Sequence, residues 1–275
     1  SLGRNRREDV KRVMEQESLI RHKIVVLNAK GGSGKTTVAT GLASWFSTRG
    51  LPTALMDHDP LNLSIRWLSK RPEEAAHIHG VAATCVSQRM TRAYQMRIPR
   101  DTRIIIVDTP AAIPRQSLFE YIRDADVILC PVGPSELDIY SASLFVEDLL
   151  KVASSHHREG RIGLIANRVR KGTIAYRNLK TFLERQPFPL VSTLRDSQNY
   201  LHCADAGLGL HELEGRDIRA DRKAWNDLSD WLAVRCGFPG PPLKAVKIRR
   251  RRTPAKNVDK AAKPPSLYVV PQGKA

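Results

Sequence analysis

Two lysines five positions apart, Lys30 and Lys35, lie in a glycine-rich segment with the sequence AKGGSGKTT, here called the phosphate loop (residues 29–37). An apolar run precedes it and a helical pattern of apolar residues follows it, which places it between a buried strand and a helix. In that setting glycine N–H groups and the positive end of the helix bind a phosphate, a lysine adds charge, and a hydroxyl ligates Mg²⁺. The sequence therefore predicts a nucleotide phosphate site at Gly31, Gly32, Ser33, Gly34, Lys35, Thr36 and Thr37.

The loop departs from the general pattern G-x-x-x-x-G-K-[ST] at its first position, where Ala29 replaces glycine. It carries Lys30 as an additional cation instead. A glycine-rich turn with one lysine also occurs as an ordinary tight turn between a strand and a helix. Two lysines, three glycines and two threonines in this setting favour the phosphate site.

Acidic residues end two further apolar segments. Asp57 and Asp59 follow one of them, and Asp108 ends the other. Hydrolysis of a nucleotide needs a metal ion, a positioned water and countercharge for the transferred phosphoryl group. We therefore expect Asp57 and Asp108 to support Mg²⁺ together with Thr36, and Asp59 to face the attacking water. Acids also end strands as simple caps, but the phosphate loop upstream favours the catalytic interpretation.

Apolar runs and helical patterns alternate along most of the chain. β-branched runs without polar alternation are typical of parallel strands covered on both faces. The sequence therefore predicts an α/β fold, a doubly wound, mostly parallel sheet flanked by helices. The expected strands span residues 24–29, 52–56, 103–110, 126–132, 161–166 and 189–193. The expected helices span residues 35–48, 62–68, 86–96, 135–155, 173–186, 197–206 and 217–236.

The chain has 275 residues and a formal net charge of +17. Its length suits one substantial domain, which we place at residues 24–236. A basic arm, residues 1–23, precedes it, and a basic Pro- and Lys-rich tail, residues 237–275, is expected to be disordered. The cysteines lack metal-like spacing and are expected to be reduced. No apolar stretch suits a membrane span or a secretion leader, which predicts a cytoplasmic protein.

Several motifs follow one another in order: the loop at 29–37, Asp57-His58-Asp59-Pro60, Val107-Asp108-Thr109-Pro110, Asn167-Arg168, and the segment with Tyr200, Ala204, Gly207, Gly209 and Glu212. Together they resemble the ParA/MinD family of deviant Walker-A ATPases over about residues 24–213. The chain is similar to the small ParA-type positioning ATPases, a group that includes the carboxysome-distributing McdA proteins.

The resemblance implies a homodimer in which two subunits enclose two ATP molecules. Lys30 then reaches across to the phosphates bound by the partner subunit. The remaining roles that the resemblance implies fall within one subunit. Lys35 contacts the β- and γ-phosphates, Thr37 contacts the α-phosphate, and Asn167 contacts the adenine edge. Thr36 binds Mg²⁺, Asp108 supports the metal ion, and Asp59 positions the attacking water.

Three features depart from the family pattern. Leu61 stands where ParA proteins often have glutamine. The N-terminal DNA-reading domain of larger plasmid partition proteins is not found, so operator-specific repression is not expected. The tail has no apolar stripe of the kind that anchors MinD proteins, so stable membrane association is not expected.

The resemblance also implies that the ATP-bound dimer binds nucleoid DNA without sequence preference, and that a cargo-adaptor protein stimulates hydrolysis. The candidate DNA-contacting residues are Arg168, Arg170, Lys171, Arg177, Lys180, Arg216, Arg219, Arg222 and Lys223. For each of them alone, an ordinary solvated surface explains the charge equally well. The run Arg249–Arg252 in the tail suits a salt-sensitive tether to DNA.

Two other classes of function fit parts of the sequence. A metabolic P-loop enzyme, such as a dethiobiotin-synthetase-like ligase or a small-molecule kinase, needs the same phosphate loop, but neither Lys30 nor the basic tail serves a pocket for a small substrate. A MinD-like membrane-surface ATPase shares the motifs and lacks support from the tail.

Overall fold

The computed structural model describes residues 21–84, 96–111, 113–154, 159–215 and 218–236. Apart from Met96, the predicted helix 86–96 lies outside these residues, as do Cys85, Arg216, the predicted tail and most of the predicted arm. Among the described residues no helix is both long enough and apolar enough to cross a membrane.

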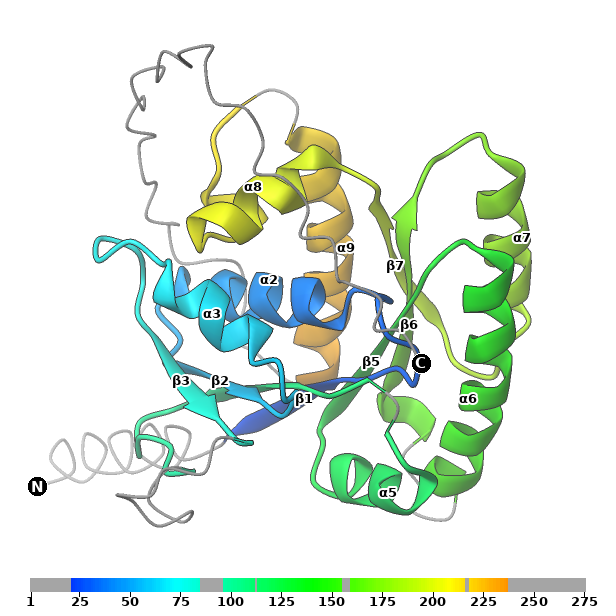
Figure 1. Ribbon diagram of the computed structural model, residues 1–275, viewed down its shortest axis with the longest axis horizontal. Helices are drawn as coiled ribbons and strands as arrows, with labels where there is room; N and C mark the ends of the chain where they lie inside the picture. Colours follow the sequence, from blue (N-terminus) through cyan, green and yellow to red (C-terminus); the bar gives the residue numbers. More distant parts are fainter. Residues whose placement is uncertain (1–20, 85–95, 112, 155–158, 216–217, 237–275) are drawn as a thin grey trace, which may run out of the picture.

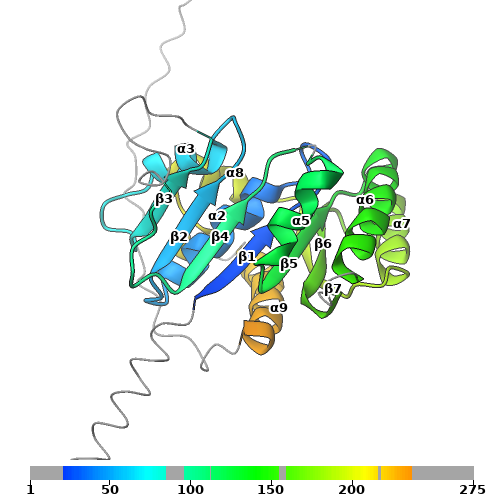
Figure 2. The same cartoon turned by 90° about the horizontal axis from the view of Figure 1, so that it is seen from below.

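Within the described part of the chain, one parallel sheet of seven strands carries the fold, in the order β3-β2-β4-β1-β5-β6-β7 (Figure 2). The strand that leads into the phosphate loop, β1, lies at the centre between β4 and β5. The strands are β1 His22–Val26, β2 Thr53–Asp57, β3 Ile78–Ala82, β4 Ile104–Asp108, β5 Val127–Val132, β6 Ile162–Val169 and β7 Leu190–Arg195.

Helices cover both faces of the sheet (Figure 1). Alternate residues along β1 and just after it belong to different cores: Ile24 and Val26 pack with α2, α3, α8 and α9, whereas Val25 and the following Leu27 pack with α5, α6 and α7. Burial of each such side chain contributes about 1.5–3 kcal/mol. The helices are α2 Lys35–Ser47, α3 Leu63–Ser69, α5 Arg115–Arg123, α6 Glu136–Ser154, α7 Ile174–Glu184, α8 Gln198–Ala206 and α9 Arg219–Cys236, with short 3₁₀ turns η1 Glu159–Arg161 and η2 Leu210–Glu212.

The structure confirms the predicted doubly wound fold and adds two elements that the sequence did not predict. Strand β3 reads IHGVA and lies at an edge of the sheet, so it is only partly buried and lacks an apolar run. Helix α5 buries only Leu118 and Ile122 and is otherwise largely polar. Its pattern is therefore too weak to stand out in the sequence.

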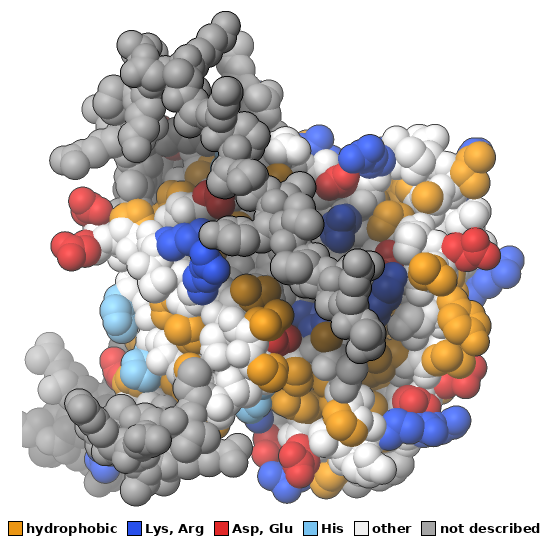
Figure 3. Space-filling view, in the orientation of Figure 1, with side chains coloured by type: hydrophobic (Ala, Val, Ile, Leu, Met, Phe, Trp, Pro, Cys, Tyr) orange, Lys and Arg blue, Asp and Glu red, His pale blue; other side chains and the backbone are white. Residues whose placement is uncertain are grey.

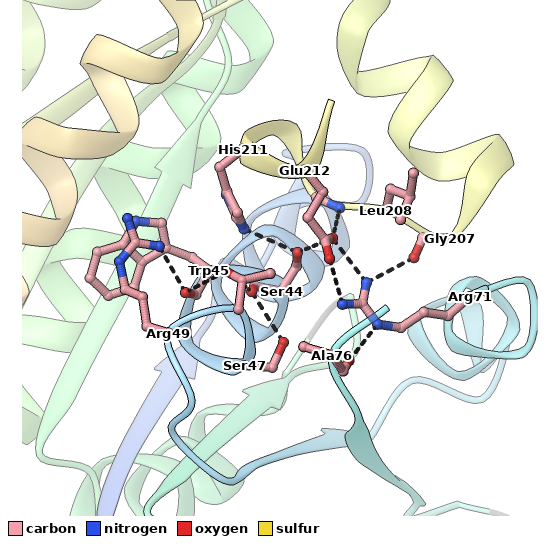
Figure 4. A network of polar contacts seen from close by, with 12 residues as sticks. Ser44, Trp45, Ser47, Arg49, Arg71, Ala76, Gly207, Leu208, His211 and Glu212 are labelled. Atoms are coloured by element: carbon pink, nitrogen blue, oxygen red, sulfur yellow. Dashed lines mark hydrogen bonds and ion pairs between the residues drawn. The ribbon is translucent and has the colours of Figure 1, made fainter. Parts of the chain in front are cut away.

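A buried ion pair ties the end of α3 to α2 and η2 (Figure 4). The side chains of Arg71 and Glu212 are 5% and 1% exposed, and Arg71 Nη2 lies 2.7 Å from Glu212 Oε1. Glu212 Oε2 accepts hydrogen bonds from Arg71 Nη1 at 3.0 Å, from the Gly209 amide at 2.7 Å and from the Ser44 hydroxyl. One carboxylate thus joins three elements of the fold.

His211 lies beside this ion pair. Its Nε2 is 3.1 Å from the Ser44 hydroxyl, and since that hydroxyl donates to Glu212, the imidazole Nε2–H donates to Ser44. The buried Nδ1 has no hydrogen-bond partner among the described residues. Burial lowers the pKa of His211 to about 4, against the opposing charge of Glu212. The folded protein therefore holds this imidazole neutral at neutral pH.

Glu212→Gln should lower the free energy of unfolding by about 3–5 kcal/mol, because it leaves the buried Arg71 guanidinium without a carboxylate. Urea denaturation followed by circular dichroism measures this change. The exposed Glu74 offers a matched control, since Glu74→Gln should stay within about 0.5 kcal/mol of the unmodified protein. Equal small effects of both variants would contradict a role of the ion pair in holding the fold.

The pH dependence of stability should carry a contribution from His211. The unfolded chain protonates this imidazole below a pKa of 6.5, whereas the folded protein does so only at about 4. The stability from the neutral ring is present above pH 6.5 and is lost as the pH falls toward 4, by up to about 3 kcal/mol. Urea titrations across that range should therefore show a smaller loss for His211→Gln. The exposed His202, changed to Gln, should leave the loss as it is.

Candidate nucleotide-binding site

The phosphate loop lies at the carboxyl end of the central strand, where it turns into α2. Gly32 and Gly34 have φ of 76° and 91°, in the left-handed region that favours glycine. The first backbone bond of α2 runs from the Val38 amide to the Gly34 carbonyl at 3.1 Å. The amides of residues 35–37 therefore lack intrahelical acceptors, which makes the start of α2 an anion site.

A cavity of about 540 Å³ opens beside this loop. Its volume lies in the range of ligand pockets. It brings together most of the residues predicted from the sequence, namely Gly31, Gly32, Gly34, Lys35, Thr36, Thr37, Asp59, Asn167 and Arg168. The sequence analysis did not predict the lining residues Leu61, Leu63, Ala111, Arg195, Asp196, Ser197, Gln198, Tyr200 and Leu201. Arg195 ends β7 and residues 196–198 follow it, so the rule that ligands bind at the carboxyl edge of a parallel sheet was the available signal.

Asp108 is a buried carboxylate at the end of β4, level with Val26 of β1 and Asp57 of β2. Neither of its oxygens has a hydrogen-bond partner by geometry among the described residues. Burial raises the pKa of Asp108 to about 7; Asp57 acts in the same direction, whereas the nearby Thr36 hydroxyl and Lys35 oppose it. An unpartnered buried carboxylate next to Thr36 fits Mg²⁺, a hard cation that one or two protein oxygens hold together with substrate phosphates.

Asp57 does not have the position that the sequence analysis gave it. The residue is fully buried, and its Oδ2 accepts hydrogen bonds from the Ser64 hydroxyl at 2.6 Å and the Ser64 amide at 2.9 Å. Its Oδ1 accepts the Asp59 amide at 2.9 Å. The carboxylate is satisfied by the loop after β2 and by the first turn of α3, so we assign it an anchoring role and no contact with Mg²⁺.

Asp59 lies in the turn after β2 and lines the cavity. Its Oδ1 accepts the Leu61 amide at 2.9 Å. Burial lowers the pKa of Lys35, and the negative charges of Asp108 and Asp59 oppose this change. This position suits the predicted contact of Asp59 with an attacking water, which stays a prediction.

The Lys30 side chain turns away from the cavity of its own subunit. Its Nζ forms an ion pair with Asp138 in the first turn of α6, and the other oxygen of Asp138 accepts the Ser135 hydroxyl at 2.6 Å. Lys35 Nζ donates to the Lys30 carbonyl at 3.2 Å. The sequence analysis missed Asp138, although an acid at the start of a predicted helix after a strand was a visible signal.

Asn167 braces the phosphate loop. The residue is 3% exposed, its Nδ2 donates to the Ser33 carbonyl at 2.8 Å, and its Oδ1 accepts the Arg168 amide at 3.0 Å. A Cβ on Gly34 would lie 2.0 Å from Asn167 Nδ2, so this approach requires glycine. The predicted contact of Asn167 with adenine stays a prediction, and the bracing role was not foreseen.

The predicted DNA-contacting residues do not form one surface. Arg168 has a left-handed φ of 54° and donates through Nη1 to the Gly32 carbonyl at 3.2 Å, so it belongs to the nucleotide cavity. Arg222 is half-buried and donates to the Leu213 carbonyl, which makes it structural. A sequence does not reveal that a guanidinium is bound to a backbone carbonyl, and the DNA contacts of these two residues stay predictions.

Two of the predicted DNA-contacting residues do lie together. Lys171 and Lys223 are exposed and line a groove of about 380 Å³ beside the edge strand β7. Arg219 is exposed on α9. Arg170 is exposed but paired with Asp196 at 2.7 Å, and Lys180 is 3.6 Å from Glu184. Exposed ion pairs of this kind are weak, so these two cations stay available to a polyanion.

Comparison with known proteins finds nucleotide-binding relatives. Residues 24–208 match the family model described as the CobQ/CobB/MinD/ParA nucleotide binding domain. The Maintenance of carboxysome distribution protein A of Halothiobacillus neapolitanus is 24% identical over 195 residues, which is 70% of this chain and 88% of that protein.

Solved structures share the fold. The structure of apo McdA from Cyanthece has a TM-score of 0.59 at 16% identity, over 77% of this chain and 99% of that one. A plasmid partition protein from Borrelia burgdorferi B31 bound to AMPPNP has a TM-score of 0.58 at 13% identity, over 78% of this chain and 99% of that one.

Asp108→Asn should reduce the affinity for Mg²⁺–nucleotide about 10–100-fold while leaving binding in EDTA unchanged. Its thermal stability without nucleotide should not fall, because the substitution removes the cost of burying a carboxylate whose pKa burial raises to about 7. Titration of a fluorescent ATP analogue with Mg²⁺ and with EDTA measures both affinities. Asp57→Asn is the contrasting variant. It should lower thermal stability and leave the difference in nucleotide affinity between Mg²⁺ and EDTA unchanged. If Asp57→Asn instead weakened Mg²⁺–nucleotide binding and Asp108→Asn instead lowered stability, the roles given to the two carboxylates would be wrong.

Proposed function

The chain belongs to the CobQ/CobB/MinD/ParA nucleotide-binding family, and from this premise we propose that it is a Mg²⁺-dependent ATPase that forms a homodimer around ATP and positions or segregates a cargo on DNA. The observation that carries the proposal is the place of Lys30. It sits in the phosphate loop yet pairs with Asp138 instead of pointing into the cavity of its own subunit.

Residues of one subunit supply the binding site for ATP. The amides at the start of α2 and the Lys35 ammonium hold the phosphates, and Thr37 contacts the α-phosphate. Thr36 and Asp108 hold Mg²⁺, which supplies charge stabilisation for phosphoryl transfer when it is bound. Asp59 orients the attacking water from the turn after β2. Asn167 keeps the loop in shape through the Ser33 carbonyl and contacts the adenine edge of the bound nucleotide.

Lys30 supplies charge across the dimer. Its side chain is 32% exposed, so it reaches the surface of the subunit at the rim of the loop. A second copy that presents its own nucleotide phosphates offers this ammonium a stronger anion than one carboxylate. ATP then joins the two subunits. Loss of the γ-phosphate on hydrolysis removes most of the negative charge that attracts the Lys30 ammonium across the interface.

DNA is the proposed surface on which the dimer moves. Lys171, Lys223 and Arg219 are exposed cations near one edge of the sheet, and the whole chain carries +17. Contacts to phosphates give affinity without sequence preference. The proposed location is the cytoplasm, on the nucleoid, with a cargo-adaptor protein that stimulates hydrolysis. The name of the Halothiobacillus relative favours a carboxysome as the cargo, and the Borrelia protein favours a plasmid.

Lys30→Ala should abolish ATP-dependent dimerisation and DNA binding, because no other lysine of the loop reaches outside its own cavity. Sedimentation velocity with a slowly hydrolysed ATP analogue measures the dimer, and fluorescence anisotropy with random-sequence DNA measures binding. The affinity of the monomer for nucleotide should change less than about threefold, since Lys35 is retained.

Asp138→Asn is the matched control for Lys30→Ala, because it breaks the same ion pair from the other side and keeps the lysine. It should dimerise with ATP at least as well as the unmodified chain. A Lys30→Ala protein that still dimerises and binds DNA with ATP would refute the proposed function, and so would loss of dimerisation in both variants to the same degree.

A further inference from the structure

A second cavity, of about 360 Å³, adjoins the nucleotide cavity and is lined by residues of α2, α3, α8 and α9. These helices gather on one face of the sheet (Figure 1). The cavity shares Thr36, Thr37, Leu63 and Tyr200 with the nucleotide cavity, and its other lining residues are Thr40, Gly41, Arg66, Trp67, Lys70, Cys203, Ala204, Leu208, Gly209, Leu210 and Trp225. Its volume lies at the lower end of the range for small-molecule pockets.

Aromatic rings whose polar atoms are already bonded form much of the wall. The Trp225 Nε1–H donates to the Tyr200 hydroxyl at 3.1 Å, and the Trp67 Nε1–H donates to the Leu208 carbonyl at 3.3 Å. Both tryptophans are buried, 2% and 5% exposed. Because the indole N–H groups are satisfied, this part of the wall offers apolar surface against which a ring or chain of a ligand can pack.

The wall that α3 contributes is fixed at both ends. The Asp57 carboxylate holds its first turn through Ser64, and the Arg71–Glu212 ion pair holds the residues just after its last turn (Figure 4). A cavity between elements anchored in this way does not close by relaxation of its walls, so it is a preformed space.

The mouth of the cavity is cationic. Arg66 is exposed on α3 and has no carboxylate within ion-pair distance among the described residues. Lys70 donates to the Ala204 carbonyl at 3.3 Å and lies 3.9 Å from Asp205, whose side chain is 83% exposed. Figure 3 shows basic side chains between α3 and α8 on this face. A guanidinium and an ammonium at the rim of an apolar chamber are complementary to an anionic group on an apolar ligand.

We propose that this cavity binds a small amphipathic anion, such as an aromatic carboxylate, with its ring against the apolar wall that includes Trp67 and Trp225 and its acid group at Arg66. The proposal does not rest on the dimerising ATPase function. It has a consequence for the nucleotide site, because α2 carries Thr36 and Thr37 and α3 follows the turn of Asp59. A ligand that contacts both helices fixes these two segments relative to one another.

Two probes that differ by one acidic group test the proposal on the full chain. 8-Anilinonaphthalene-1-sulfonate carries an anion, and N-phenyl-1-naphthylamine has the same rings without it. Titrations that follow probe fluorescence and energy transfer from tryptophan give both affinities. Arg66→Gln should weaken the sulfonate about tenfold, the effect of one lost charge-assisted hydrogen bond, and the neutral probe less than about twofold.

A pair of alanine substitutions locates the bound probe. Ala204 is exposed at the mouth of the cavity, and Ala175 is an exposed alanine on α7 that does not line it. Ala204→Phe should weaken both probes about tenfold or more, and Ala175→Phe should weaken neither. ADP at saturating concentration should leave the sulfonate bound.

Three results would overturn the proposal. One is equal binding to the Ala204→Phe and Ala175→Phe proteins, which indicates a surface outside the cavity. Another is equal weakening of both probes by Arg66→Gln, which removes the anion contact. The third is complete displacement of the sulfonate by ADP, which places it in the nucleotide cavity.

Discussion

The structure depends mainly on how helix α2 begins. The backbone amides of its first turn have no acceptors within the helix, and they must face the site where a phosphate binds. A helix that begins directly at the carboxyl end of a central strand needs a tight connection, and Gly32 and Gly34 provide it with left-handed backbone conformations. The Asn167 side chain then fills the space that Gly34 leaves and holds the Ser33 carbonyl. The loop is therefore shaped before any anion arrives, so little ordering cost remains for binding.

The buried carboxylates differ in whether they accept hydrogen bonds from the protein. Asp57 and Glu212 accept several hydrogen bonds each, and removal of either leaves donors without acceptors. Asp108 lies level with Asp57 in the neighbouring strand, yet it has no partner by geometry and its pKa is raised to about 7. A satisfied carboxylate stabilises the folded chain, whereas an unsatisfied one costs stability that only a cation recovers. This difference favours Asp108 over Asp57 as the residue that holds the proposed Mg²⁺.

The parts of the fold and site that depend on local sequence were predictable. Central strands are continuous apolar runs, and the phosphate loop has a fixed spacing, so both were recognised. The edge strand β3 was not, because half of its pattern faces solvent. Asp57 was assigned to the metal because two acids one residue apart point the same way on a strand, but β2 ends at Asp57 and the chain turns there. Arg168 and Arg222 were assigned to DNA because a charge pattern carries no information about backbone carbonyls in contact.

The ion pair between Lys30 and Asp138 has a strength that suits a reversible contact. Its two side chains are 32% and 17% exposed, so solvent screens their attraction. The pair is therefore closer to a surface ion pair, which contributes about 0–1 kcal/mol, than to the buried Arg71–Glu212 pair. A buried pair at this position would hold the lysine in its own subunit against any competing anion. A wholly free lysine would lose more side-chain entropy on binding, up to about 2 kcal/mol. The partly exposed pair therefore keeps Lys30 ordered at the rim of the loop, and in the proposed dimer it is weak enough for the triphosphate of a second subunit to replace Asp138.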